Sequence, residues 1–150
     1  MIHVVDDNIA FAGLLTEVIS GLDEKCLTFH SAVEYLEFMS AAEYEPPMAI
    51  FTDVNMPEIN GYELIEKVLA IYPEQKFVVV SGAPEFNHAA KAHACIYLSK
   101  PFNFAVIQDV IRSLRKCNSD GYSSDNGCMD VCDRSLFALE SWSCPHQQCV

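Results

Sequence analysis

The sequence predicts an α/β fold in which helices cover both faces of a parallel β-sheet. Five short apolar segments alternate with five segments of helical periodicity, and short connections separate them. Several apolar segments, such as Phe77 to Val80, are continuous runs, which is typical of strands that are buried on both faces. Because right-handed crossovers between parallel strands place helices on both sides, we expect a doubly wound sheet of five strands.

The first half of the chain predicts three strands and two helices. Asn8 can cap the first helix, and Ser31 with Glu34 forms a capping-box pattern at the start of the second. We assign the apolar stripe of the first helix to Leu14, Leu15, Val18 and Ile19. The expected strands span residues 2–5, 25–29 and 48–52, and the expected helices span residues 8–20 and 31–40.

The second half predicts two more strands and three more helices. The helical pattern that follows Gly61 ends at Tyr72-Pro73, and a thinly apolar helix can open at Pro84. Asn103 can cap the last helix, which we expect to end at about residue 116. The strands between these helices are expected at residues 75–80 and 94–98.

The composition restricts the class of partner and the location. The chain has 9 Lys and Arg residues against 21 Asp and Glu residues, and its net charge is −12. This charge opposes nonspecific binding to nucleic acid and to anionic membranes. The sequence has no apolar run of about 18 residues and no signal-peptide pattern, so we expect a cytoplasmic protein without a membrane span.

Charged or hydroxyl side chains follow four of the five expected strands. They are Asp6 and Asp7 after the first strand, Asp53 after the third, Ser81 at the end of the fourth and Lys100 after the fifth. Because the carboxyl ends of parallel strands meet at one edge, we expect these groups to converge. Clustered carboxylates repel one another unless a cation neutralises them, and oxygen ligands favour Mg²⁺. A carboxylate in such a site can also accept a phosphoryl group.

Residues 1 to about 116 resemble the receiver domain of two-component response regulators. The resemblance rests on several motifs that occur in the expected order. They are Asp6-Asp7, the segment Asp53-Val-Asn-Met-Pro57 with Gly61 eight residues after Asp53, Ser81, and Tyr97 three residues before Lys100-Pro101. The resemblance implies a flavodoxin-like sheet with the strand order 2-1-3-4-5.

The resemblance also implies a phosphorylation site with a metal ion. Asp53 would accept the phosphoryl group from the histidine of a sensor histidine kinase or a histidine phosphotransfer protein. Asp7, Asp53 and the backbone carbonyl of Asn55 would bind Mg²⁺ directly, and Asp6 would act largely through a bound water. The protein would therefore be a signalling protein and no conventional enzyme.

Further residues would carry the response. Lys100 would pair with a phosphoryl oxygen, and its bond to Pro101 would be cis. Ser81 would move toward the phosphoryl group, and Tyr97 would turn into the space that Ser81 leaves. The surface formed by residues 84–116 would then bind a downstream protein partner in a two-state switch.

Residues 117–150 depart from the receiver pattern. They begin with a polar segment rich in Asn, Ser, Asp and Gly, which indicates a flexible linker. The segment that follows carries four cysteines, Cys128, Cys132, Cys144 and Cys149. Disorder or a loosely docked helix, a Zn²⁺ site, and a redox-sensitive thiol group are all open interpretations of this tail.

Three other functions compete with a phosphoacceptor. The tail could sense metal or redox state, with the receiver only carrying it. The receiver could also bind partners without being phosphorylated, although the acid pair, Asp53 and Lys100 speak against that. A haloacid-dehalogenase-type phosphatase also uses an Asp at a strand end, but this class usually has a second Asp two residues later, where this chain has Asn55.

Overall fold

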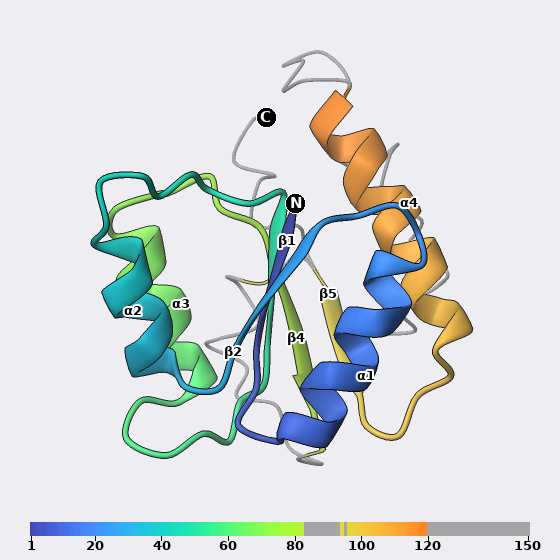
Figure 1. Ribbon diagram of the computed structural model, residues 1–150, viewed down its shortest axis with the longest axis horizontal. Coiled ribbons are helices and arrows are strands. Elements are labelled where there is room, and N and C mark those ends of the chain that lie inside the picture. Colours follow the sequence, from blue (N-terminus) through green and yellow to red (C-terminus); the bar gives the residue numbers. More distant parts are fainter. Residues whose placement is uncertain (83–93, 95, 120–150) are drawn as a thin grey trace.

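A single sheet of five parallel strands, in the order β2-β1-β3-β4-β5, forms the centre of the molecule (Figure 1). The structure is a computed structural model that describes residues 1–82, 94 and 96–119. The strands are β1 (Ile2–Val5), β2 (Cys26–Phe29), β3 (Ala49–Thr52), β4 (Phe77–Ser81) and β5 (Ile96–Ser99). Val5 is aligned with both Phe29 and Thr52, so the carboxyl ends of the first three strands lie at one level. The predicted fold class and strand order are confirmed.

Four described helices cover the two faces of this sheet. They are α1 (Ile9–Ser20), α2 (Ala32–Met39), α3 (Gly61–Leu69) and α4 (Ala105–Ser119). Figure 1 shows α1 and α4 on one side of the sheet and α2 and α3 on the other. Within β4, Val78 and Val80 pack into the core on the α1 and α4 side, whereas Phe77 and Val79 pack into the core on the other side. The two cores explain why the strand sequences are apolar without interruption.

The starts of α1 and α2 follow the predicted capping residues, whereas α4 begins at Ala105, two residues after the predicted cap Asn103. The Asn8 side chain accepts a hydrogen bond from the Phe11 N–H (3.1 Å), and the Ser31 hydroxyl accepts one from the Glu34 N–H (3.0 Å). The Glu34 carboxylate returns to the N–H of His30 (2.7 Å), one residue before the capping serine. In a regular capping box this carboxylate accepts from the N–H of the capping residue itself. At α2 it accepts from the N–H of the residue before it.

Two helix predictions are corrected by the structure. Leu14 is 47% exposed, and the buried residues of α1 are Ala12, Leu15 and Ile19. Consecutive helical residues point about 100° apart, so a helix that buries Leu15 at its centre turns Leu14 toward solvent. The last helix continues to Ser119, into the segment assigned to a linker, because no Gly or Pro interrupts it there.

Other predictions lie outside the described residues. These are the helix that opens at Pro84 and the linker and tail beyond Ser119. Among the described helices, none is both long and apolar enough to cross a lipid bilayer.

The loop between β3 and α3 is closed by a contact that only glycine can make. A Cβ atom at Gly61 would lie 2.1 Å from the carbonyl oxygen of Asp53, a distance that real Cβ atoms essentially never show. The Gly61 N–H instead donates to the Val54 carbonyl oxygen at 2.9 Å. Within the same loop Glu58 has a left-handed backbone with a φ of 68°, and Val54 and Met56 are buried. The backbone after Asp53 is thus held against the start of α3.

His3 is a buried polar residue within the aromatic core between the sheet and α2. Its Nδ1 lies 2.9 Å from the Tyr35 hydroxyl, which in turn lies 2.8 Å from the Tyr44 hydroxyl. Its Nε2 has no hydrogen-bond partner among the residues that the structure describes. Burial, with a smaller effect of the N-terminal ammonium, lowers the pKa of His3 to about 4. The imidazole is therefore neutral in the folded protein at pH 7.

We expect replacement of Gly61 by alanine to destabilise the protein. The added methyl group meets backbone and cannot be relieved by a side-chain rotation, so Gly61→Ala should lower the free energy of unfolding by about 2–4 kcal/mol. Gly13→Ala is the matched control, because a Cβ there meets nothing within 4 Å. It should raise the free energy of unfolding by about 0.5–1 kcal/mol. Urea denaturation measures both values, and an unchanged midpoint for Gly61→Ala would contradict the close contact.

We expect His3 to make the stability depend on pH in the acid range. The unfolded chain takes up a proton on this side chain below pH 6.5, while the folded protein resists protonation down to pH 4. Stability should therefore fall by up to about 3 kcal/mol as the pH drops through this window. His3→Leu should show a smaller loss of unfolding free energy between pH 7 and pH 4.5 in urea titrations. Equal losses in the two proteins would rule out this role of His3.

Candidate functional site

Three carboxylates meet at the carboxyl edge of the sheet. Asp6 and Asp7 follow β1, and Asp53 follows the neighbouring strand β3. Each of them offers a carboxylate oxygen, and these oxygens lie within 4.8 Å of one another. Asp6 and Asp53 are buried, whereas Asp7 is exposed. The Asn8 N–H donates to Asp6 Oδ1 at 2.8 Å and fixes this carboxylate beside the start of α1.

Lys100 reaches into this acidic pocket from the segment after β5. Its Nζ lies 3.0 Å from Asp6 Oδ2 and 3.7 Å from Asp53 Oδ1. Its backbone N–H donates to the Ser81 carbonyl oxygen at 2.8 Å, which ties the segment to the end of β4. The Lys100-Pro101 peptide bond is cis, as the resemblance to receiver domains implies. The ammonium therefore stands between two of the three carboxylates.

Burial dominates the electrostatics of Asp53. It raises the pKa of this carboxyl group above its ordinary value, while the Lys100 ammonium opposes the shift and the Asp6 and Asp7 carboxylates add to it. One ammonium leaves an excess of negative charge in the pocket. The donor set consists of carboxylate oxygens, which fit a hard divalent cation.

The other predicted residues lie around this pocket. Ser81 is fully buried at the end of β4, and Tyr97 is 5% exposed within β5. Asn55 is exposed in the loop after Asp53. The part of the predicted output surface at residues 84–93 and 95 lies outside the described residues, as do Cys128, Cys132, Cys144 and Cys149.

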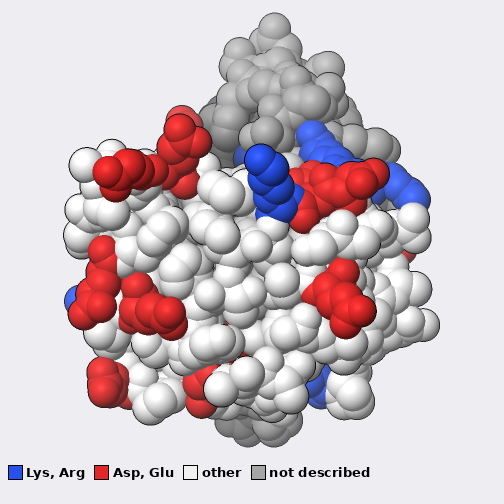
Figure 2. Space-filling model, in the orientation of Figure 1, with Lys and Arg blue, Asp and Glu red and all other residues white. Residues whose placement is uncertain are grey.

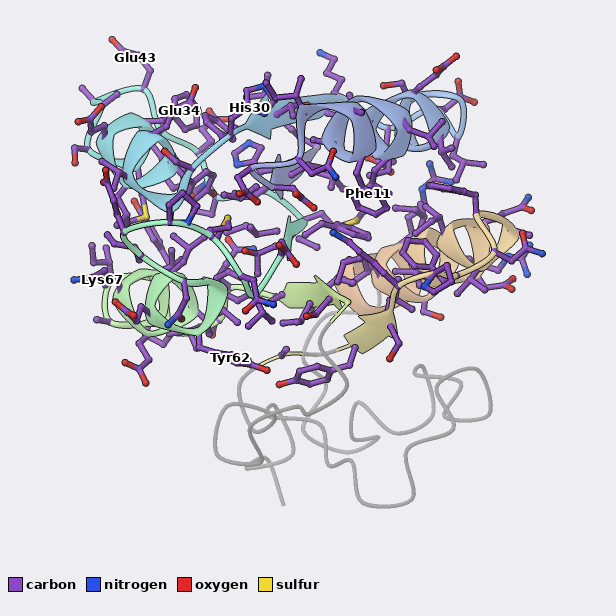
Figure 3. All side chains as sticks on the ribbon, turned by 90° about the horizontal axis from the view of Figure 1, so that it is seen from below. Phe11, His30, Glu34, Glu43, Tyr62 and Lys67 are labelled. Atoms are coloured by element: carbon purple, nitrogen blue, oxygen red, sulfur yellow. The ribbon has the colours of Figure 1, made fainter. Side chains whose placement is uncertain are left out.

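Two further residues, which the sequence patterns do not predict, contact the pocket. The Lys100 Nζ lies 4.0 Å from the centroid of the Phe11 ring, and His30 Nδ1 lies 3.4 Å from the Asp6 carbonyl oxygen. Figure 3 looks onto this edge of the sheet, and the labelled Phe11 lies between α1 and α4. Periodicity offered no signal for either residue, because their contacts join distant parts of the chain. An aromatic residue close after an acid pair is the one pattern that could have drawn attention to Phe11.

Comparison with known proteins gives related chains of two kinds. The chain is 36% identical over 80 residues to the uncharacterized transcriptional regulatory protein YesN of Bacillus subtilis, a match that covers 49% of this chain and 22% of YesN. It is 26% identical over 106 residues to the DNA-binding transcriptional regulator NtrC of Escherichia coli, covering 69% of this chain and 22% of NtrC. This chain thus spans about a fifth of these longer regulators.

A shorter relative is matched over most of its length. The chain is 29% identical over 117 residues to a CheY homologue of Campylobacter jejuni, covering 74% of this chain and 88% of that protein. A CheY-like receiver domain from Methylobacillus flagellatus has a similar structure, with a TM-score of 0.66, 28% identity and coverage of 75% of this chain and 96% of that one.

A further structure shares the fold and was solved with bound ions. This structure is the response regulator TrrA from Thermotoga maritima, described in complex with Mg²⁺ and BeF. It has a TM-score of 0.67 at 23% identity, and the match covers 75% of this chain and 96% of TrrA. The sequence model of the response regulator receiver domain matches residues 2–112, which is most of this chain. The chain therefore belongs to the response regulator receiver domain family, the phosphoacceptor module of two-component signal transduction.

Proposed function

We propose that Asp53 of this receiver domain accepts a phosphoryl group from the histidine of a sensor histidine kinase or a histidine phosphotransfer protein. The observation that carries the proposal is the pocket itself, in which Asp53 lies beside two further carboxylates and 3.7 Å from the Lys100 ammonium. Lys100 is the group that can meet negative charge as it develops on a transferred phosphoryl group. Asp53 supplies the nucleophilic oxygen, and the bond between phosphorus and the donor's histidine nitrogen breaks.

We further propose that Mg²⁺ is the cation of this pocket. When bound, Mg²⁺ would neutralise the carboxylates and the oxygens of the phosphoryl group. Asp7, Asp53 and the carbonyl of Asn55 would hold it directly. The 3.0 Å ion pair of Asp6 with Lys100 supports an indirect role for Asp6, because that carboxylate already has a cationic partner. Asp53 remains the acceptor, while Asp7 contributes charge from the solvent side of the site.

The same arrangement suggests how phosphorylation changes the surface of the protein. Ser81 is buried at the end of β4 and its carbonyl oxygen accepts from the Lys100 N–H, so β4 and the segment after β5 are coupled next to the pocket. A hydrogen bond from the Ser81 hydroxyl to the phosphoryl group would draw this end of β4 inward, and Tyr97 would follow. The downstream protein partner would read the change on residues 84–116, in a two-state equilibrium.

The charge of the molecule favours protein partners over nucleic acid. Figure 2 shows acidic side chains spread across one face, including the side formed by α2 and α3. The net charge of −12 would repel a phosphate backbone.

The intact pocket also argues against a receiver that works without phosphorylation. In this proposal the protein is a signalling switch whose only chemistry is its own phosphorylation and dephosphorylation.

We expect a Mg²⁺-dependent gain of one phosphoryl group at Asp53. Wild type and Asp53→Asn are incubated with acetyl phosphate, with and without Mg²⁺, and the intact mass is measured. The samples without Mg²⁺ contain excess EDTA, which removes the cation. The gain should occur only in wild type with Mg²⁺, because the variant lacks the nucleophilic carboxylate oxygen. A gain of equal size in the variant would show that another residue accepts the phosphoryl group. No gain in wild type would count against the proposal.

We also expect Mg²⁺ alone to stabilise the fold. The ion binds the folded pocket and relieves repulsion among its carboxylates, so a concentration of 100 times the dissociation constant should add about 2.7 kcal/mol. Asp7→Asn should lose most of the resulting rise in melting temperature. Glu43→Gln removes an exposed carboxylate at a distance from the pocket (Figure 3) and should keep that rise. Identical shifts in the two variants would place the Mg²⁺ effect elsewhere.

A further inference from the structure

We propose that Phe11 is a positioning residue for Lys100, whose ammonium it holds beside Asp53 during phosphorylation. The inference rests on the proposed roles of Asp53 and Lys100. The Lys100 Nζ lies 4.0 Å from the centroid of the Phe11 ring, well within the range at which a ring face attracts a cation. The side chain of Lys100 is 23% exposed, so its contacts in the pocket compete with solvent for the ammonium.

The ring differs in kind from the other partners of this ammonium. Asp6 and Asp53 attract Lys100 at 3.0 and 3.7 Å, but both carboxylates also belong to the acidic cluster that fits a divalent cation. Phosphorylation would turn Asp53 into an acyl phosphate. The contact with Phe11 depends on neither event. It can therefore keep the flexible four-carbon stem of Lys100 in place while its anionic partners change.

Phe11 is itself held by two sets of contacts. Its N–H is bonded to the capping Asn8 side chain in the first turn of α1. Its ring centroid lies 6.1 Å from that of Phe102, in an edge-on arrangement, and 6.3 Å from that of Phe104. Phe102 and Phe104 also pack on each other, with centroids 5.4 Å apart. Both lie within three residues after Pro101, so the three rings connect α1 to the segment that carries the lysine.

The main competing interpretation is that Phe11 only fills space between α1 and α4. The two roles differ in what a leucine at position 11 does. Phe11→Leu keeps an apolar side chain in the core but removes the ring face, whereas Phe11→Tyr keeps the ring face. Phe38→Leu is the matched control for stability, because it makes the same change in a half-buried phenylalanine of α2, on the opposite side of the sheet.

The test combines a rate with a spectroscopic signature. The rate of Mg²⁺-dependent phosphorylation by acetyl phosphate is measured by intact mass at saturating Mg²⁺. The ε-methylene resonance of Lys100 is followed by NMR in protein with ¹³C-labelled lysine and assigned with Lys100→Arg. A lysine ε-methylene above a ring face resonates upfield, and this shift needs no phosphorylation.

We expect Phe11→Leu to be phosphorylated about 3-fold to 10-fold more slowly than wild type and to lose the upfield shift. Phe11→Tyr and Phe38→Leu should each keep the phosphorylation rate and the upfield shift near their wild-type values. A wild-type rate in Phe11→Leu, or an equal loss of rate in Phe38→Leu, would overturn the positioning role. Wild type without any phosphorylation would overturn the proposed function, and this role with it.

Discussion

The close approach of three carboxylates is the constraint that the rest of this structure has to satisfy. Their oxygens lie within 4.8 Å of one another, and two of the three side chains are buried, where like charges repel strongly. The aligned ends of β1 and β3 impose this proximity, because Val5 is paired with Thr52. Packing of two apolar cores against the sheet supplies the stability that offsets the repulsion. The free energy that offsets the repulsion among the carboxylates thus comes from packing throughout the fold.

The segments that follow the strands fix the positions of the charged groups. Asp6 is held by the N–H of Asn8, which also caps α1, so one short turn orients a carboxylate and begins a helix. Asp53 is followed by a backbone that can pass α3 only because Gly61 has no side chain. Lys100 is tied to β4 through the Ser81 carbonyl oxygen. A backbone group close by in the fold therefore helps to place each functional group.

Features that follow from local sequence or from the geometry of a parallel sheet could be predicted, and side-chain contacts that follow from neither could not. The strands, the capping residues and the meeting of Asp6, Asp7 and Asp53 follow from apolar runs and the geometry of parallel sheets. The prediction that Leu14 is part of the buried stripe is wrong, because periodicity defines a stripe but not which of two adjacent leucines lies at its centre. The contact of Phe11 with Lys100 joins the first helix to the segment after the last strand, and no spacing in the sequence indicates this contact.

The balance of charge around Lys100 suggests why one pocket can serve both a resting and a phosphorylated state. At rest the ammonium is nearest Asp6, at 3.0 Å, and its distance to Asp53 is 3.7 Å. A phosphoryl group on Asp53 would bring more negative charge and more acceptor oxygens than the carboxylate it replaces. The preference of Lys100 would then move from Asp6 toward Asp53 without a large displacement. Because the Lys100 backbone is bonded to the end of β4, a small shift of this residue would be passed to β4 and to its neighbour β5.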